Sequence, residues 1–203
     1  GAIRAGMARL QLVGRSRSIP QKQAAAAVGQ GLLMQTYAEA FQHHDLVVAQ
    51  ILLTREDLRD RARYLNARNT FAALLRSNVV PIVNENDTVA VDEIKFGDND
   101  TLAALVASLI EADSLLLLSD VAGLYERDPS LFPDSRLIPV VDRIDKALEQ
   151  RAGGARTAMG TGGMATKIKA AKICVRTGVR MVIAHGRRDN VIQEALAGRE
   201  GTQ

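Results

Sequence analysis

The sequence predicts an α/β fold with a mainly parallel central sheet and helices on both of its faces. Nearly continuous apolar runs at residues 46–53, 79–83 and 114–118 are typical of strands that are buried on both faces. Longer segments between them carry apolar residues at helical spacing. Strands that alternate with helices along most of a chain are typical of an α/β/α sandwich.

Helical periodicity and cap signals place the elements of the first half. The Thr54-Arg55-Glu56-Asp57 segment is typical of an N-cap followed by acidic residues, so a helix is predicted to begin there. In order, the predicted elements are helices at 1–13 and 21–42, a strand at 46–53, a helix from 54 to 74 or 75, a strand at 79–83 and a small hairpin at 89–96.

The second half continues the alternation and contains no repeat or linker, so one domain over 1–203 is predicted. The predicted elements are a helix at 101–112, strands at 114–118 and 137–141, a short helix at 144–150, a helix ending at Gly178, a strand at 180–184 and a helix at 191–196.

Composition narrows the functional classes. No apolar run approaches the length that spans a membrane, no signal peptide opens the chain, and the single Cys174 favours a buried thiol in a reducing cytoplasm. Five basic and no acidic residues in 1–38 leave open a nucleic-acid binder, although a solvated face is the commoner explanation. The 3% aromatic content argues against a surface that stacks bases.

A glycine-rich segment at 160–167 opens the helix that ends at Gly178. Glycines allow backbone N–H groups to approach a ligand, and the start of a helix attracts anions, phosphate above all. The segment lacks the residues of a Walker loop, and no strand precedes it as a dinucleotide fingerprint requires. A flexible loop that merely caps a helix is the alternative. The residues predicted to bind phosphate are Thr161, Gly162, Gly163, Met164, Ala165, Thr166 and Lys167.

Acidic and amide residues follow the predicted strands. In a parallel sheet these strand ends meet at one edge, so we expect one cleft to hold Asp87, Asp98, Asn99, Asp100, Asp120 and Lys167. Carboxylates beside a lysine and phosphate-binding backbone suit phosphoryl transfer, with Lys167 stabilising charge and Asp100 orienting it. Asp98 and Asp100 also flank a helix start, where capping explains them equally well.

Four separated segments carry a family resemblance. They are Ile82-Val83-Asn84-Glu85-Asn86-Asp87, Phe96-Gly97-Asp98-Asn99-Asp100, Leu117-Leu118-Ser119-Asp120 with Gly123-Leu124-Tyr125 and Asp128-Pro129, and 160–167. Together they resemble the amino-acid kinase family, and the resemblance covers essentially the whole chain. Within that family the chain most resembles the enzymes that phosphorylate the γ-carboxylate of L-glutamate from ATP, the first step of proline biosynthesis.

The resemblance implies roles for individual residues. Asp87, Asn99 and Asp98 are implied in substrate binding, Asp100 and Lys167 in catalysis, and Ser119 and Asp120 in ATP binding with the glycine-rich segment. Mg²⁺ is expected on the ATP phosphates, with no metal cage in the protein. A homo-oligomer (dimer or tetramer) and feedback inhibition by proline are implied as well, without membrane or nucleic-acid partners.

Two parts of the family pattern are missing. Members begin with a strand and a loop that supplies a second phosphate-binding lysine, and they often end in an RNA-modifying-enzyme-like (PUA) domain. The chain is therefore interpreted as an amino-acid kinase domain that is truncated at its N-terminus, and 1–203 alone is expected to be poorly active or inactive. Another carboxylate or carbamate kinase of the family, or a non-catalytic chain that only binds ligand, remains the alternative.

Overall fold

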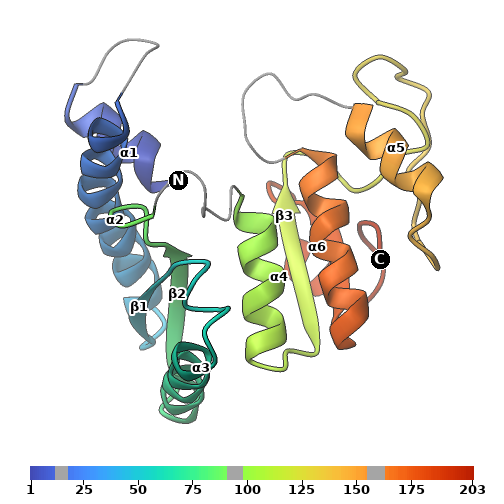
Figure 1. Ribbon diagram of the computed structural model, residues 1–203. Helices are drawn as coiled ribbons and strands as arrows, with labels where there is room; N and C mark the ends of the chain where they lie inside the picture. Colours follow the sequence, from blue (N-terminus) through green and yellow to red (C-terminus); the bar gives the residue numbers. More distant parts are fainter. Residues whose placement is uncertain (12–17, 91–97, 155–162) are drawn as a thin grey trace. The chain divides into compact units, whose positions relative to one another are not determined.

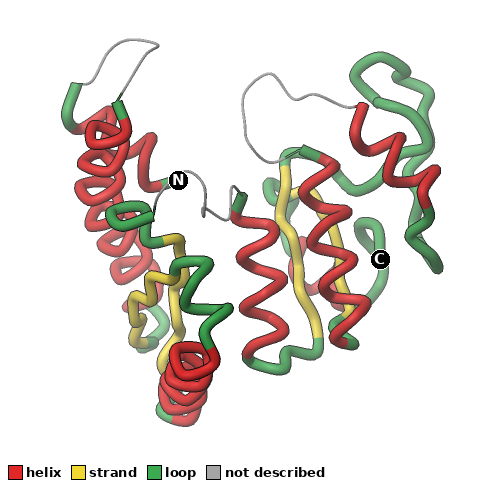
Figure 2. The backbone as a smooth tube through the Cα atoms, viewed as in Figure 1, coloured by secondary structure: helices red, strands yellow, loops and turns green. Residues whose placement is uncertain are grey.

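The computed structural model describes residues 1–11, 18–90, 98–154 and 163–203, with the backbone alone for 151–154. The chain divides into two compact units, Gly1–Phe96 and Gly97–Gln203. Each contains a pair of parallel strands with helices packed around it, which confirms the predicted α/β class (Figure 2). The organisation of residues 1–203 as one domain stays a prediction.

The first unit is built on the parallel pair of β1 and β2, with Val47 opposite Val79 and Leu53 opposite Glu85. Phe71 and Leu53 are buried in its core. Figure 1 shows α1 lying along α2 in this unit. Its elements are α1 (Ala2–Arg9), α2 (Ile19–Gln42), β1 (Val47–Leu53), α3 (Arg61–Arg76) and β2 (Val79–Glu85).

Two glycines allow α1 and α2 to touch backbone to backbone. A Cβ atom on Gly6 would lie 1.7 Å from the carbonyl oxygen of Ala25, and one on Gly29 would lie 1.7 Å from that of Ala2. Any side chain at either position would overlap the opposite backbone. Such close packing of two helices depends on glycine, because side chains otherwise keep helix axes about 8–10 Å apart.

Local capping moves two helix starts away from their predicted positions. Ser18 and Gln21 form a capping box, so α2 begins at Ile19, two residues before the prediction. The predicted start at Thr54 is wrong: Thr54 and Asp57 close a turn, and α3 begins only at Arg61, where the Asp60 carboxylate accepts a hydrogen bond from the Arg63 backbone N–H. Thr54 and Asp57 satisfy each other across the turn, so the cap signal is real although no helix follows it directly.

The turn at Thr54 gives the first unit a pH-dependent contribution to stability. Partial burial raises the pKa of Asp57, but hydrogen bonds from the Thr54 backbone and hydroxyl and from Arg63 outweigh it, and the pKa lies below its usual 3.8. A carboxylate with a lowered pKa stabilises the fold above that usual value and loses its contribution as the pH falls through the folded-state pKa.

We therefore expect Asp57→Asn to lower the free energy of unfolding by about 1 kcal/mol at pH 7, and to have progressively less effect towards pH 3. Urea denaturation of both proteins between pH 3 and 7 measures the difference. A difference that stays constant over this range would contradict the assignment.

The second unit is built on β3 and β4, which are parallel with Ser114 opposite Arg180 and Ser119 opposite His185. Helices α4 and α6 pack together beside β3 (Figure 1). Small side chains at their contact, Ala104 and Ala170, are fully buried. The elements are α4 (Asn99–Leu109), β3 (Ser114–Ser119), α5 (Lys146–Gly154), α6 (Met164–Thr177), β4 (Arg180–His185) and α7 (Val191–Leu196).

Cys174 lies in the same core. It is fully buried, as predicted, and burial raises the pKa of its thiol. The predicted end of the helix at Gly178 is also confirmed, because Gly178 is the C-cap of α6 with a φ of 74° that favours glycine.

Some predictions for the second unit are wrong in detail. Residues 137–141 form no strand; Leu137 makes only an isolated bridge with Tyr125. Helix α4 begins two residues before the predicted start, because the Asp98 side chain accepts a hydrogen bond from the Thr101 backbone N–H. Most of the predicted hairpin at 89–96 lies outside the described residues.

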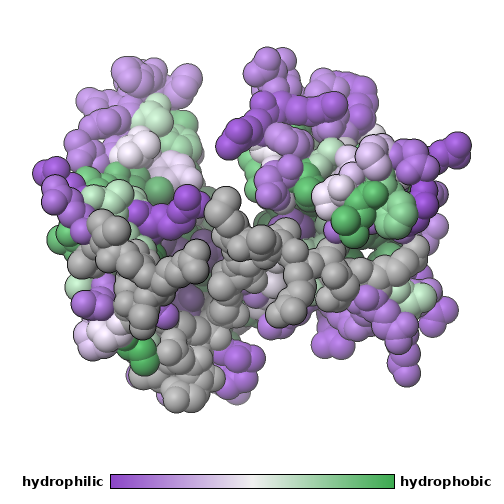
Figure 3. All heavy atoms as spheres, turned by 90° about the horizontal axis from the view of Figure 1, so that it is seen from above, coloured by the Kyte–Doolittle hydropathy of each residue, from purple (hydrophilic) through white to green (hydrophobic). Residues whose placement is uncertain are grey.

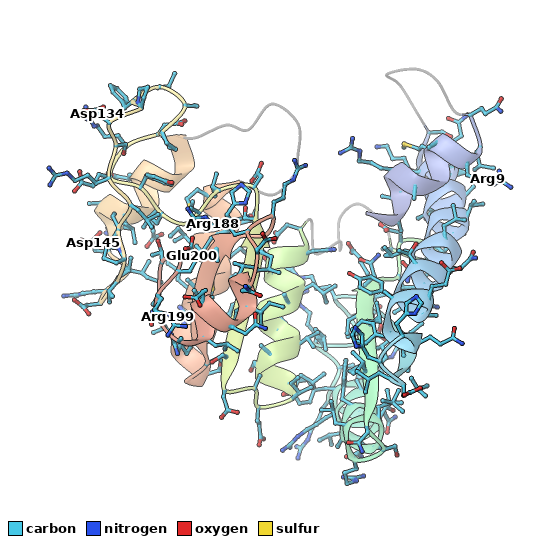
Figure 4. The ribbon with its side chains drawn as sticks, turned by 180° about the vertical axis from the view of Figure 1, so that it is seen from behind. Arg9, Asp134, Asp145, Arg188, Arg199 and Glu200 are labelled. Atoms are coloured by element: carbon cyan, nitrogen blue, oxygen red, sulfur yellow. The ribbon has the colours of Figure 1, made fainter. Side chains whose placement is uncertain are left out.

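The C-terminal residues are hydrogen-bonded to β4. Thr202 and Ile183 exchange two backbone hydrogen bonds of 2.9 Å, and Arg180 donates to the Gln203 side chain at 2.8 Å. Arg188 and Glu200 form an ion pair and are labelled in Figure 4 with the neighbouring Arg199. These contacts place an antiparallel segment beside the parallel pair.

The surface is mixed. Figure 3 shows hydrophobic patches among hydrophilic side chains, and the exposed apolar residues include Val47 and Leu131. Among the described residues, no helix is both long enough and apolar enough to cross a membrane.

Candidate functional site

A lysine–carboxylate pair lies where two helices of the second unit begin. The Lys167 ammonium is 3.1 Å from Oδ2 of Asp100, and their side chains are only 9% and 19% exposed. Asp100 is the second residue of α4 and Lys167 the fourth of α6. The predicted partnership of these two residues is thus present, although their catalytic role stays a prediction.

The position of Lys167 near the start of α6 is unfavourable for the stability of that helix taken by itself. A cation in the first turn opposes the helix dipole, whereas the Asp100 carboxylate is favourably placed at the start of α4. A paired charge buried in this way contributes little net stability. Such an arrangement is typical of a functional site, where a charge that is unfavourable for its own helix is compensated by a neighbouring charge of opposite sign.

Thr166 adds a third member to this pair. Its hydroxyl lies 2.6 Å from Oδ2 of Asp100 and 2.7 Å from the carbonyl oxygen of Gly163. One hydroxyl proton serves only one of these acceptors at a time. The sequence predicts Thr166 as a phosphate contact, but its described contacts bind it to Asp100, the same oxygen that accepts from Lys167.

The start of α6 has no side-chain cap. Gly163 is the N-cap residue, and Met164 and Ala165 follow it in the first turn. Uncapped N–H groups at a helix start are available to an anion. The rest of the predicted phosphate loop, including Thr161 and Gly162, lies outside the described residues.

Asp98 caps α4. Its Oδ1 accepts from the Thr101 backbone N–H at 2.6 Å and its Oδ2 from the Thr101 hydroxyl at 3.0 Å. The capping explanation that the sequence left open is therefore present in the structure, while substrate binding by Asp98 stays a prediction. Asn99, exposed at the first position of α4, also stays a predicted substrate contact.

We expect Asp98→Ala to lower the free energy of unfolding by about 1 kcal/mol, because the first turn of α4 loses its cap. Asp98→Ser, which keeps an acceptor, should retain most of the stability. Urea denaturation of the three proteins measures this, and equal stability of Asp98→Ala and the unaltered protein would exclude a capping role.

Ser119 and Asp120 lie at the carboxyl end of β3, where the Ser119 hydroxyl donates to the exposed Asp120 carboxylate at 3.1 Å. In Figure 1 this strand end lies on the same side of the second unit as the first turns of α4 and α6. Ligands of parallel α/β sheets bind outside this end of the strands. The predicted contact with ATP is compatible with this placement and is otherwise untested.

Asp87 lies in the first unit, where it is half-buried and lines a pocket of about 340 Å³. The predicted convergence of Asp87 with Asp100 and Lys167 joins residues of two separately described units, so it stays a prediction. The pocket is bounded by Ala2, Ala26, Ala27, Gln30, Gly31, Gln50, Leu52, Glu85, Asn86, Asp87 and Thr88.

Two amides that line this pocket, Gln30 and Gln50, were not predicted from the sequence. Gln30 and Asn84 are buried at 7% and 9% exposure, and their amides are hydrogen-bonded at 3.0 Å. Gln30 also donates to Gln50 at 3.1 Å. A glutamine in an alanine-rich helix facing two buried strands is the only sequence signal that could have indicated it.

A second pocket, of about 580 Å³, lies in the second unit among α5, α6 and the C-terminal residues. Its lining is mainly apolar and includes neither Asp100 nor Lys167. Within the described ranges, no group of three or more His, Cys, Asp or Glu side chains is arranged to hold a metal ion.

Comparison with known proteins identifies the family. A family model described as the amino acid kinase family matches residues 3–185. The chain belongs to the amino acid kinase family. This membership agrees with the α/β architecture.

Curated members of the family are closely similar. Glutamate 5-kinase of Caldanaerobacter subterraneus subsp. tengcongensis is 56% identical over 98% of this chain and 53% of its own length. Glutamate 5-kinase of Clostridium acetobutylicum is 53% identical over 97% of this chain and 73% of its own length. The chain spans about half the length of most of the curated relatives it matches.

Two solved kinase structures share the fold. An isopentenyl phosphate kinase superposes with a TM-score of 0.62 at 16% identity, covering 98% of this chain and 77% of that one. An aspartate kinase from Synechocystis superposes with a TM-score of 0.59 at 18% identity, covering 98% of this chain and 32% of that one. At this identity the similarity supports the fold alone.

Proposed function

We propose that the protein to which residues 1–203 belong carries out ATP-dependent phosphorylation of the γ-carboxylate of L-glutamate, which gives glutamyl 5-phosphate, the first step of proline biosynthesis. The observation that best supports this proposal is the buried Asp100–Lys167 pair at the starts of two helices. The chain is also 53–56% identical to proteins named glutamate 5-kinase. Phosphoryl transfer relies on positioning and charge stabilisation, and this pair offers a fixed cation for that purpose.

In the proposed reaction a γ-carboxylate oxygen attacks the γ-phosphorus of ATP, a new O–P bond forms, and the bond to ADP breaks. Lys167 stabilises the negative charge on the transferring phosphoryl group, and Asp100 with Thr166 fixes the direction of its ammonium. The uncapped start of α6 contributes backbone N–H groups to the phosphates. Mg²⁺ belongs on the ATP phosphates, since it usually binds through substrate phosphates with few protein ligands.

The pocket that contains Asp87 is assigned to the amino acid. Its described lining has two carboxylates, Glu85 and Asp87, and no lysine, arginine or histidine. Opposite charges attract strongly where solvent is partly excluded, so this lining favours the α-ammonium of an amino acid. Proline is proposed to inhibit by binding the same pocket, and the protein is proposed to assemble as a dimer or tetramer in the cytoplasm.

The test is hydroxamate formation by the intact protein with ATP, Mg²⁺ and hydroxylamine, which traps an acyl phosphate. Glutamate should support hydroxamate formation at least tenfold faster than aspartate or carbamate. Equal rates with another acid would favour a different carboxylate or carbamate kinase. Binding of glutamate and ATP in isothermal titration without any turnover would favour a ligand-binding protein.

A further inference from the structure

Three amides form a directed chain from the core of the first unit to the Asp87 pocket. Nδ2 of Asn84 in β2 donates to Oε1 of Gln30 in α2 at 3.0 Å. Nε2 of Gln30 then donates to Oε1 of Gln50 in β1 at 3.1 Å. Gln30 and Asn84 are buried, whereas Gln50 is exposed. Burying amides is costly unless their hydrogen bonds are made, so the chain connects three elements through polar contacts at a place where apolar residues would otherwise serve.

The direction of the chain determines what Gln50 presents. Each link uses the oxygen of the next amide as its acceptor, so the Gln50 oxygen is occupied by Gln30 and the Gln50 Nε2 is left as the terminal donor. No described residue accepts a hydrogen bond from this Nε2. Successive hydrogen bonds polarise one another, which strengthens the donor at the end of the chain.

The charge of the pocket explains why such a donor is needed. Gln30 and Gln50 line it together with Glu85 and Asp87, and its described lining contains no basic side chain. An amino acid that places its ammonium near these carboxylates still brings carboxylates of its own into an acidic pocket. A neutral donor can bind a carboxylate there without competing with the ammonium for Asp87.

We propose that Gln50 Nε2 donates a hydrogen bond to a carboxylate of the amino-acid ligand, and that Gln30 and Asn84 are positioning residues that aim it. This inference rests on the proposed function, because it takes the ligand to be an amino acid. It adds a substrate-contacting residue in β1 to a site previously assigned to residues that follow β2.

The first test replaces the terminal donor while keeping the chain intact. In Gln50→Glu an oxygen still accepts from Gln30, but the ligand meets a carboxylate instead of an N–H. Isothermal titration of L-glutamate into the intact protein should show at least a tenfold rise in Kd, whereas the KM for ATP should stay within twofold. Gln42→Glu makes the same charge change at the end of α2, outside the pocket, and should leave the Kd unchanged.

The second test asks whether Gln30 acts through Gln50. Gln30→Met breaks the chain and should raise the Kd for glutamate severalfold with kcat little changed. The double variant Gln30→Met/Gln50→Glu should bind no more weakly than Gln50→Glu alone, because the aimed donor is already absent. A purely structural Gln30 would instead give additive effects on the Kd.

The outcomes separate this inference from the proposed function. A Kd for Gln50→Glu within twofold of the unaltered protein, or an equal change in Gln42→Glu, would overturn it, and so would additivity of the two substitutions. Failure of the unaltered protein to bind glutamate would overturn both. Glutamate binding that is sensitive to Gln50 but without glutamate-dependent hydroxamate would support the amide contact and reject the kinase.

Discussion

Replacing Lys167 by methionine is expected to lower kcat for glutamate-dependent ADP release by about 10²–10³-fold, with a much smaller change in KM for glutamate. Removal of one preorganised group that stabilises transition-state charge has an effect of this order. Lys167 is held by Asp100 at 3.1 Å and is 7% exposed, so solvent does not easily replace it. Steady-state kinetics of the intact protein measure the effect.

The matched control is Lys169→Met. Lys169 lies two residues further along α6 and is exposed, so the same loss of charge should leave kcat within twofold. Because Lys167→Met also leaves the Asp100 carboxylate partly buried without its cation, its folding must be confirmed by thermal unfolding. A folded Lys167→Met protein with kcat within threefold of the unaltered protein would contradict the catalytic role.

The largest effect on stability is expected from Gly29→Ala, which should lower the free energy of unfolding by about 3 kcal/mol. The new Cβ would lie 1.7 Å from the carbonyl oxygen of Ala2, so α1 must separate from α2. Overpacking of this kind costs about 1–3 kcal/mol or more, and backbone cannot move aside as a flexible side chain does. Urea denaturation measures the loss, and hydrogen exchange should locate it in α1.

Gly31→Ala provides a control of opposite sign in the same helix. Nothing lies within 4 Å of a Cβ at Gly31, so the substitution should stabilise α2 by up to about 1 kcal/mol through alanine's higher helix propensity. Destabilisation by both substitutions to the same extent would show that the contact of α1 with α2 is not responsible.

Long apolar runs allowed the positions of the strands to be predicted. The prediction that they are buried on both faces is wrong for β1 and β3, where Val47 and Leu118 are 64% and 48% exposed. β1, β3 and β4 are all close to their predicted limits. Helix starts were predicted less well, since they depend on which of several nearby polar side chains forms a hydrogen bond with the backbone N–H groups of the first turn. Thr54 bonded with Asp57 in a turn, and Asp98 extended α4 beyond its periodic residues. The pattern of apolar residues predicts neither the turn at Thr54 nor the earlier start of α4.

The candidate site divides in the same way. The pairing of Asp100 with Lys167 could be predicted because both residues lie near the start of a predicted helix, and such helix starts meet at one edge of a parallel sheet. The hydrogen bond between Thr166 and Asp100 joins two residues that are 66 positions apart in sequence, and it depends on the directions of side chains on two different helices. The amide chain of Gln30 likewise depends on the rotation of α2 over β1 and β2, which periodicity does not specify.

Glutamate-dependent ADP release by the intact protein, measured for Asp87→Asn and Lys167→Met, tests the central claim most directly. If Asp87 binds the amino acid and Lys167 stabilises phosphoryl transfer, Asp87→Asn should raise the KM for glutamate at least tenfold with the KM for ATP within twofold, and Lys167→Met should lower kcat. ADP release that is indifferent to glutamate, or that stays within twofold of the unaltered protein in both variants, would contradict the claim that both residues act in one kinase reaction.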